Sequence, residues 1–284
     1  MTRRGWLLFL AVGVIWGMPY LLIRIAVATI DPLVIAFGRT LIGSLLLLPV
    51  AIHRKALASA FRRWPALVAF TLVEISGPWL LIGHAETRLN SSTTGLLIAM
   101  VPLFAAILVA WLGHEKLEPR RIVGLALGFA GVAAIVGLDI DVSNFAAVGA
   151  LVLATIGYAI GPIIINRRLA DAPPIGVVTG SFIVATLLYA PFLPFLWPEH
   201  PAAGGIAAVA GLGVICTAVA FVFFFALIAE IGPARATVIA YVNPVVAVML
   251  GVIFLAEPFT FAMAIGFTMV IVGSILATTK RQPA

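Results

Sequence analysis

The stretch STTGLLIAMVPLFAAILVAWL, residues 92–112, indicates the fold class because it holds no charged side chain over a length that matches a lipid bilayer. About 20 consecutive apolar residues are enough for a helix to cross the hydrocarbon core. Inside lipid, every backbone N–H and C=O group must be paired within the chain, so only helices and closed barrels can span it. The stretch shows no alternation of period two, and we therefore predict a membrane-spanning helix.

Segments of the same kind recur along the chain. We expect ten spans, at about residues 5–28, 33–52, 65–84, 92–112, 120–138, 145–166, 175–197, 204–229, 235–256 and 261–279. The 284 residues are 63% apolar and 10% charged, whereas soluble domains carry about 25% charged residues. This composition excludes a cytosolic enzyme, a nucleic-acid binder and a disordered chain. It predicts an all-α integral membrane protein with ten transmembrane helices.

The basic residues predict how these spans are oriented. Cytoplasmic loops are enriched in Lys and Arg. With the N-terminus in the cytoplasm, the even-numbered loops and both ends of the chain carry 14 of the 17 basic residues, and the opposite side carries only Arg88. The other two, Arg24 and Arg39, lie within apolar segments. We therefore expect both termini to be cytoplasmic.

A weak internal repeat divides the chain into halves. When each residue is compared with the one 142 positions later, several residues with backbone or charge roles coincide: Pro32 with Pro174, Gly38 with Gly180, Pro49 with Pro191, Pro102 with Pro244, Glu115 with Glu257, Gly124 with Gly266, and Gly131 with Gly273. Each half holds five spans, an odd number, so the second half enters the membrane from the opposite side. We predict two inverted five-helix repeats, residues 1–142 and 143–284, an arrangement typical of transporters.

These residues also resemble a known family. Trp16-Gly17, Arg39, Pro102 and the run from Glu115 through Gly124 to Gly131 are similar to the EamA module, and the second half repeats the later part of the pattern with Pro244, Glu257, Gly266 and Gly273. The chain resembles two-module members of the EamA family, in the drug/metabolite transporter superfamily. Within that family it is most similar to bacterial aromatic amino-acid exporters of the YddG type, and this resemblance implies a place in the bacterial inner membrane.

The resemblance implies a basket of helices 1–4 and 6–9 around a central cavity, with helices 5 and 10 outside. The two halves differ at the charged positions. Ser181 stands at the position equivalent to Arg39, and Asn166 at the position equivalent to Arg24. The role of these two arginines is therefore not repeated in the second half of the chain.

Three ionisable residues fall within predicted spans. A charge at a helix centre costs about 2.5–3.5 kcal/mol on insertion scales, so Arg39 should face a partner or water. Its candidate partners are Glu74, Glu86 and Glu257, in a packing ion pair, and the alternative is a substrate carboxylate. Arg24 lies near a helix end and could snorkel to the interface. Glu74 lies mid-span, where it could carry a proton, bind a substrate ammonium or serve as a counter-ion.

Two further acidic residues close helices 4 and 9. Glu115 and Glu257 occupy symmetric positions, and each could cap the helix that follows it by accepting from free backbone N–H groups. We expect a structural or gating role for them.

Prolines and glycines predict interruptions in the helices. Proline removes one backbone hydrogen bond, and broken helices expose helix ends at a cavity. The expected hinges are Gly17, Pro19, Pro78, Pro102, Gly161, Pro162 and Pro244. In helix 5, the small face Gly124-x-x-x-Gly128 favours packing within the chain over dimerisation.

Aromatic and polar residues away from span ends are candidates to line the cavity: Trp16, Tyr20, Trp79, His84, Tyr158, Tyr241 and Asn243. Tryptophans near span ends are more typical of the interfacial belt, and Trp6, Trp64, Trp111 and Trp197 are interpreted in that way. Some of the candidate lining residues could belong to the belt as well.

No cofactor or metal site is expected, since the single Cys216 and four scattered His residues offer no ligand spacing. An embedded enzyme would need His, Asp or Ser clusters within spans, which are missing. We expect a secondary transporter with alternating access, moving neutral or zwitterionic metabolites and exporting aromatic and other apolar amino acids. The partners expected are a small-molecule substrate and the bilayer, with no nucleic acid. The chain would act as a monomer, or as a homodimer. The alternatives are a drug/metabolite efflux protein with another substrate and a non-transporting assembly subunit.

Overall fold

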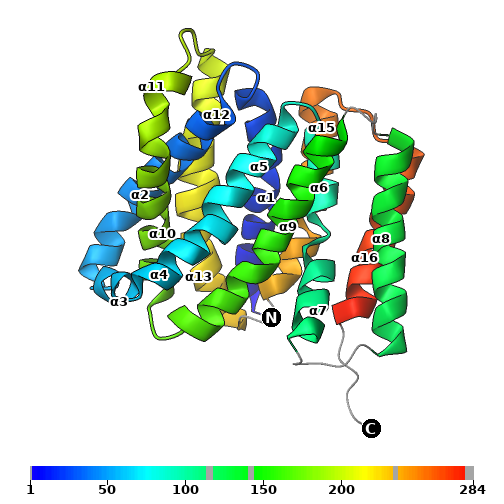
Figure 1. Cartoon of the computed structure of the whole chain (residues 1–284), viewed down its shortest axis with the longest axis horizontal. Helices are drawn as coiled ribbons and strands as arrows, with labels where there is room; N and C mark the ends of the chain where they lie inside the picture. Colours follow the sequence, from blue (N-terminus) through cyan, green and yellow to red (C-terminus); the bar gives the residue numbers. More distant parts are fainter. Residues whose placement is uncertain (1, 113–117, 140–143, 233–235, 279–284) are drawn as a thin grey trace.

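Helices account for all the regular structure in the part of the chain that can be described. The structure is a computed structural model, which describes residues 2–112, 118–139, 144–232 and 236–278 (Figure 1). Within these ranges there is no β-strand, and ten helices are long and apolar enough to cross a membrane. The prediction of ten spans is therefore confirmed.

The first five spans begin and end close to the predicted positions. They consist of α1 (Arg3–Ala26); α2 (Pro32–His53); α4 (Trp64–Phe70), η1 (Thr71–Ser76) and α5 (Gly77–Glu86) in one continuous span; α6 (Ser91–Ile98) with α7 (Val101–Trp111); and α8 (Pro119–Asp139). A short helix, α3 (Leu57–Arg62), connects the second and third spans. The segment η1 is a π-helix, in which each backbone hydrogen bond joins residues five apart rather than four apart as in an α-helix.

The second half of the chain also contains five spans. They consist of α9 (Phe145–Ile164) with the π-helix η3 (Ile165–Leu169); α10 (Pro174–Tyr189) with η4 (Ala190–Phe192) and α11 (Leu193–Leu196); α12 (Ala203–Gly213), the π-helix η5 (Val214–Val219) and α13 (Ala220–Ile231); η6 (Thr237–Tyr241) with α15 (Asn243–Leu255); and α16 (Phe261–Thr278). The third span of each half thus contains a π-helix, η1 or η5.

The expected helix interruptions occur at some prolines and not at others. Pro102 and Pro244 stand in the first turns of α7 and α15, directly after the breaks in the fourth and ninth spans. Pro78 begins α5, after the π-helix η1. These positions suit proline because the first turn of a helix leaves its N–H groups unpaired anyway.

The other predicted interruptions are wrong. Helix α1 continues through Gly17 and Pro19, and α9 continues through Gly161 and Pro162. A proline in a membrane helix can be accommodated when neighbouring helices re-satisfy the freed backbone groups. Gly17 and Gly161 instead allow close packing, since a Cβ at Gly17 would overlap Val246 and a Cβ at Gly161 would overlap Glu74.

Helices α8 and α16 pack against each other at one edge of the bundle (Figure 1). A Cβ at Gly124 would approach Gly273 O to 2.7 Å, and a Cβ at Gly131 would approach Gly266 O to 2.5 Å. Rising numbers on α8 therefore meet falling numbers on α16, so the two helices are antiparallel. Gly128 packs on Leu103 of α7, which places this small-residue face inside the chain.

We expect Gly131→Val to separate α8 from α16, because its side chain would enter space filled by Gly266 and Met269. Overpacking of this kind costs about 1–3 kcal/mol. The thermal unfolding midpoint in detergent should fall by several degrees. The neighbouring Ala130→Val serves as control, because Ala130 is exposed. Equal midpoints for the two variants would contradict the packing role.

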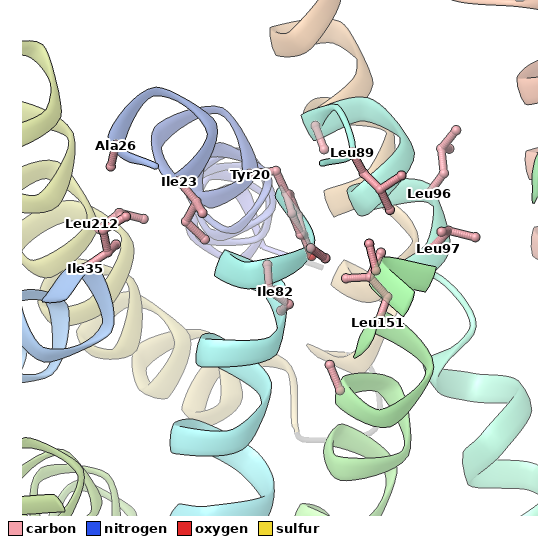
Figure 2. Packing of buried hydrophobic residues seen from close by; sticks show 14 of the residues in the cluster. Tyr20, Ile23, Ala26, Ile35, Ile82, Leu89, Leu96, Leu97, Leu151 and Leu212 are labelled. Atoms are coloured by element: carbon pink, nitrogen blue, oxygen red, sulfur yellow. The ribbon is translucent and has the colours of Figure 1, made fainter. Parts of the chain in front are cut away.

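Apolar side chains cover the outside of the bundle as well as its inside. Figure 2 shows Tyr20, Ile82, Leu97 and Leu151 gathered among α1, α5, α6 and α9, in the largest buried cluster. On the outside, the four tryptophans assigned to the belt are 52–82% exposed. Surfaces of this kind suit lipid rather than water. The chain is therefore a multi-pass membrane protein.

Candidate functional site

Arg39 is a buried cation inside the bundle, on α2. Its Nε donates to Thr217 Oγ1 at 3.0 Å, and its guanidinium carbon lies 3.6 Å from the ring centroid of Trp79. Thr217 lies in the π-helix η5 and donates in turn to Leu212 O. The stacking holds the guanidinium plane against an aromatic face, an arrangement that favours a desolvated cation.

The expected ion pair of Arg39 is not formed. Where side chains are described, neither Glu74, Glu86 nor Glu257 lies within salt-bridge distance of Arg39, and the ion pair present joins Arg63 to Asp171 at the bundle surface. An aromatic ring and a hydroxyl group take the place of the carboxylate. Because a guanidinium carries five N–H donors, the four on the two Nη atoms remain without an acceptor among the described residues.

Tyrosines surround this guanidinium. Tyr20 and Tyr158 lie within electrostatic range of it, as does Tyr189. Tyr189 donates from its hydroxyl to Ser76 O at 2.7 Å, at the end of the π-helix η1. Buried tyrosine hydroxyls usually find such a partner. This hydrogen bond fixes the Tyr189 hydroxyl at the end of η1, within electrostatic range of Arg39.

Glu74 is the second ionisable group of the site and lies in η1. Its Oε2 is buried and has no hydrogen-bond partner within the described residues. The carboxyl group packs against Gly161 of α9, where any larger residue would overlap it. Tyr158 interacts electrostatically with both Glu74 and Arg39. Tyr158 thus lies near both a buried carboxyl group and a buried cation, which form no ion pair with each other.

The remaining candidate lining residues are distributed differently. Trp79 is buried between Arg39 and Phe182, and Trp16 packs against Phe221 and Phe224. Tyr241 is half-buried at the break in the ninth span. Asn243 lies at the same break, and its amide nitrogen can donate to Gly13 O and Ile239 O.

Two further predicted residues lie near the end of α5. His84 is exposed in the last turn of this helix. Arg24 donates from its Nη1 to Glu86 O at 2.5 Å. The C-terminal carbonyls of α5 attract this cation, as the negative end of a helix does in general.

Glu257 caps a helix, but not the one that follows it. Its carboxylate accepts from the backbone N–H groups of Ser91 and Ser92 at 2.8 Å each, at the start of α6 in the other half of the chain. The hydroxyls of both serines donate to it as well. Gly251 leaves room for this carboxylate beside α15. Glu115 lies outside the described residues.

Sequence reasoning missed Thr217 and Tyr189. Thr217 stands 142 residues after Ile75, in the part of the second half that corresponds to the Glu74 region, and this equivalence was the available signal. Tyr189 could have been found as a tyrosine inside a predicted span, since its hydroxyl needs a partner there.

Ten apolar helices that enclose a buried cation and a buried carboxyl group are the arrangement expected of a membrane transport protein. Comparison with known families agrees. The EamA-like transporter family matches the chain twice, over residues 3–137 and over residues 145–279. The chain belongs to this family, and it is a transporter.

Relatives of similar length carry names without an assigned substrate. An uncharacterized transporter of Archaeoglobus fulgidus is 24% identical, with 98% of this chain and all of the relative covered. The uncharacterized transporter YvbV of Bacillus subtilis is 27% identical, with 99% and 93% covered. The uncharacterized inner membrane transporter YedA of Escherichia coli K12 is 28% identical, with 85% and 79% covered. A solved crystal structure with 21% identity superposes with a TM-score of 0.70 over 98% of each chain, which shows the fold.

Proposed function

We propose that this protein is a secondary transporter of zwitterionic amino acids, and that it exports aromatic and other apolar ones across the inner membrane. The observation that carries the proposal is the unpaired acid and base of the site. Arg39 offers two Nη atoms without an acceptor among the described residues, and Glu74 offers a carboxyl oxygen without a donor there. An amino acid supplies both missing groups, since its carboxylate matches a guanidinium fork and its ammonium matches a carboxylate.

The walls of the site support an aromatic or apolar side chain. Trp79 stacks on Arg39, Phe182 packs on Trp79, and Tyr158 lies within electrostatic range of both Arg39 and Glu74. A doubly charged phosphate ester would need more than one cation, whereas Arg39 is the cation that the described part of this site provides. The resemblance to exporters of the YddG type agrees with this choice of substrate. Because one chain supplies the whole site, we propose that a monomer is sufficient, with the bilayer as its other partner.

We propose alternating access between two inverted repeats, 1–142 and 143–284. Three observations support the inversion: the two family matches begin 142 residues apart, the third span of each half contains a π-helix, and α8 meets α16 antiparallel through equivalent glycines. The breaks before Pro102 and Pro244 are the proposed hinges. The basic loops and the name of YedA support the inner membrane with both termini in the cytoplasm.

The test is transport by the purified full chain in proteoliposomes loaded with unlabelled amino acid. We expect exchange of labelled Phe, Trp, Met or Thr. Phenethylamine, which lacks the carboxylate, and phenylpropionate, which lacks the ammonium, should compete weakly. Failure of all four amino acids to move would overturn the proposal. It would favour another metabolite or a drug as substrate, or a subunit that does not transport.

A further inference from the structure

Glu86 is a buried carboxyl group that the substrate site does not use. It is the last residue of α5, and this helix ends on the side of the bundle away from the N-terminus (Figure 1). Its side chain is 0% exposed, and neither Oε1 nor Oε2 has a hydrogen-bond partner within the described residues. Its backbone oxygen alone is bound, by Arg24. A buried polar group left without partners is costly, and much more so when it is charged.

A second carboxylate lies near Glu86. Glu257, in the connection between α15 and α16, interacts electrostatically with it. Both oxygens of Glu257 are occupied by Ser91 and Ser92, as described above, so its negative charge is compensated by N–H and O–H donors. Glu86 and α6 belong to the first half of the chain, whereas Glu257 belongs to the second. The hydrogen bonds from Ser91 and Ser92 to Glu257 therefore join the two halves of the chain near the end of α5.

Few other charges face Glu86. From α1, Arg24 and Tyr20 lie within electrostatic range of it, but Arg24 gives its hydrogen bond to the backbone rather than to the carboxyl group. The neighbouring α9 carries no charged residue over 145–164. From α2, Asp31 accepts from Leu33 N at the start of the helix, and Arg39 is stacked on Trp79. None of these groups forms an ion pair with Glu86 within the described residues.

These surroundings favour a proton over a metal ion as the occupant. A hard cation needs about six oxygen ligands, whereas Glu257 has no oxygen to spare and the described residues contain no cluster of three ligating side chains. A proton removes the charge of Glu86 with no ligand at all. It also removes the electrostatic repulsion between Glu86 and Glu257.

We propose that Glu86 is a proton-binding site that locks this end of the bundle shut. In the closed state Glu86 is neutral and rests beside the capped Glu257. When the two halves separate, water reaches Glu86, its proton passes to that water, and two negative charges then oppose closure. Closing requires that Glu86 take a proton back from the same side. Acid on that side therefore favours the closed state.

One test is infrared spectroscopy of the reconstituted full chain, which detects the C=O stretch of a neutral carboxyl group. In a Glu74→Gln background, which lacks the other buried carboxyl group, we expect a difference band between acidic and alkaline buffer that disappears when Glu86→Gln is added. Glu230→Gln is the matched control, because Glu230 accepts from Thr2 Oγ1 at the opposite end of the bundle, and it should keep the band. A band that is retained after Glu86→Gln is added to Glu74→Gln would overturn the proposal.

A second test follows opening directly. In a Cys216→Ala background, Thr93→Cys places a thiol in the first turn of α6, where Thr93 is buried. Its labelling by an impermeant maleimide, divided by that of the exposed Ala203→Cys, should rise several-fold as the outside pH rises. With Glu86→Gln added, the ratio should stay low at every pH. An unchanged pH profile would overturn the lock, whereas no labelling of Ala203→Cys would reject the proposed orientation instead.

Discussion

Replacement of Arg39 by glutamine should abolish exchange of amino acids while the protein still folds. Truncating one partner of a buried, hydrogen-bonded charge pair costs about 2–5 kcal/mol, which is about 30- to 4,000-fold in affinity. Glutamine keeps a polar donor near Thr217 and Trp79 but loses the charge and the fork of N–H groups. The half-saturating concentration of Phe in proteoliposome exchange is the measurement.

The Arg39→Lys variant separates charge from geometry. Lysine keeps the positive charge, but it cannot donate from Nε to Thr217 while offering two parallel donors to a carboxylate. We expect it to recover only a small part of the lost affinity. Phenethylamine, which has no carboxylate, should bind Arg39→Gln as it binds the wild type. Equal loss for Phe and phenethylamine would show that Arg39 acts through the structure and not on the substrate.

Local signals predicted the helices and some of their breaks. A long apolar run must form a helix in lipid whatever its neighbours are, so the ten spans could be predicted from residues alone. The breaks before Pro102 and Pro244 follow from the missing N–H of proline. The same rule failed at Pro19 and Pro162, because the packing of neighbouring helices decides whether a proline interrupts a membrane helix.

The partners of the buried groups could not be predicted in this way. Arg39 meets Thr217, 178 residues later, because η5 turns a hydroxyl toward it, and no proline signals that π-helix. Glu257 was expected to cap the next helix, but the fold brings α6 closer. These contacts depend on how the two halves are placed against each other. A pattern of residues along one helix does not contain that information.

Replacement of Gly161 by alanine should lower transport by displacing the Glu74 carboxyl group. A Cβ there would overlap Glu74 Oε2 and lie 2.7 Å from its Cδ, so Gly161→Ala should push the carboxyl group out of its place. The clash involves the end of a side chain that can rotate, so the helix α9 should still fold. We expect transport to fall at least about tenfold, equivalent to about 1.4 kcal/mol. Glu74→Gln, which keeps the shape but not the charge, should show a similar loss.

The double variant tests whether the two residues act together. With Glu74→Ala the space beside Gly161 is empty, so adding Gly161→Ala should cost little more than Glu74→Ala alone. Residues in contact show coupling energies of about 0.5–3 kcal/mol, whereas independent sites add. Gly149→Ala is the matched control, because a Cβ at Gly149, on the same helix, would meet no atom of the described residues within 4 Å, and this variant should transport at the wild-type rate. Additive losses, or a transport rate of Gly161→Ala equal to that of Gly149→Ala, would mean that the position of the Glu74 carboxyl group does not matter for transport.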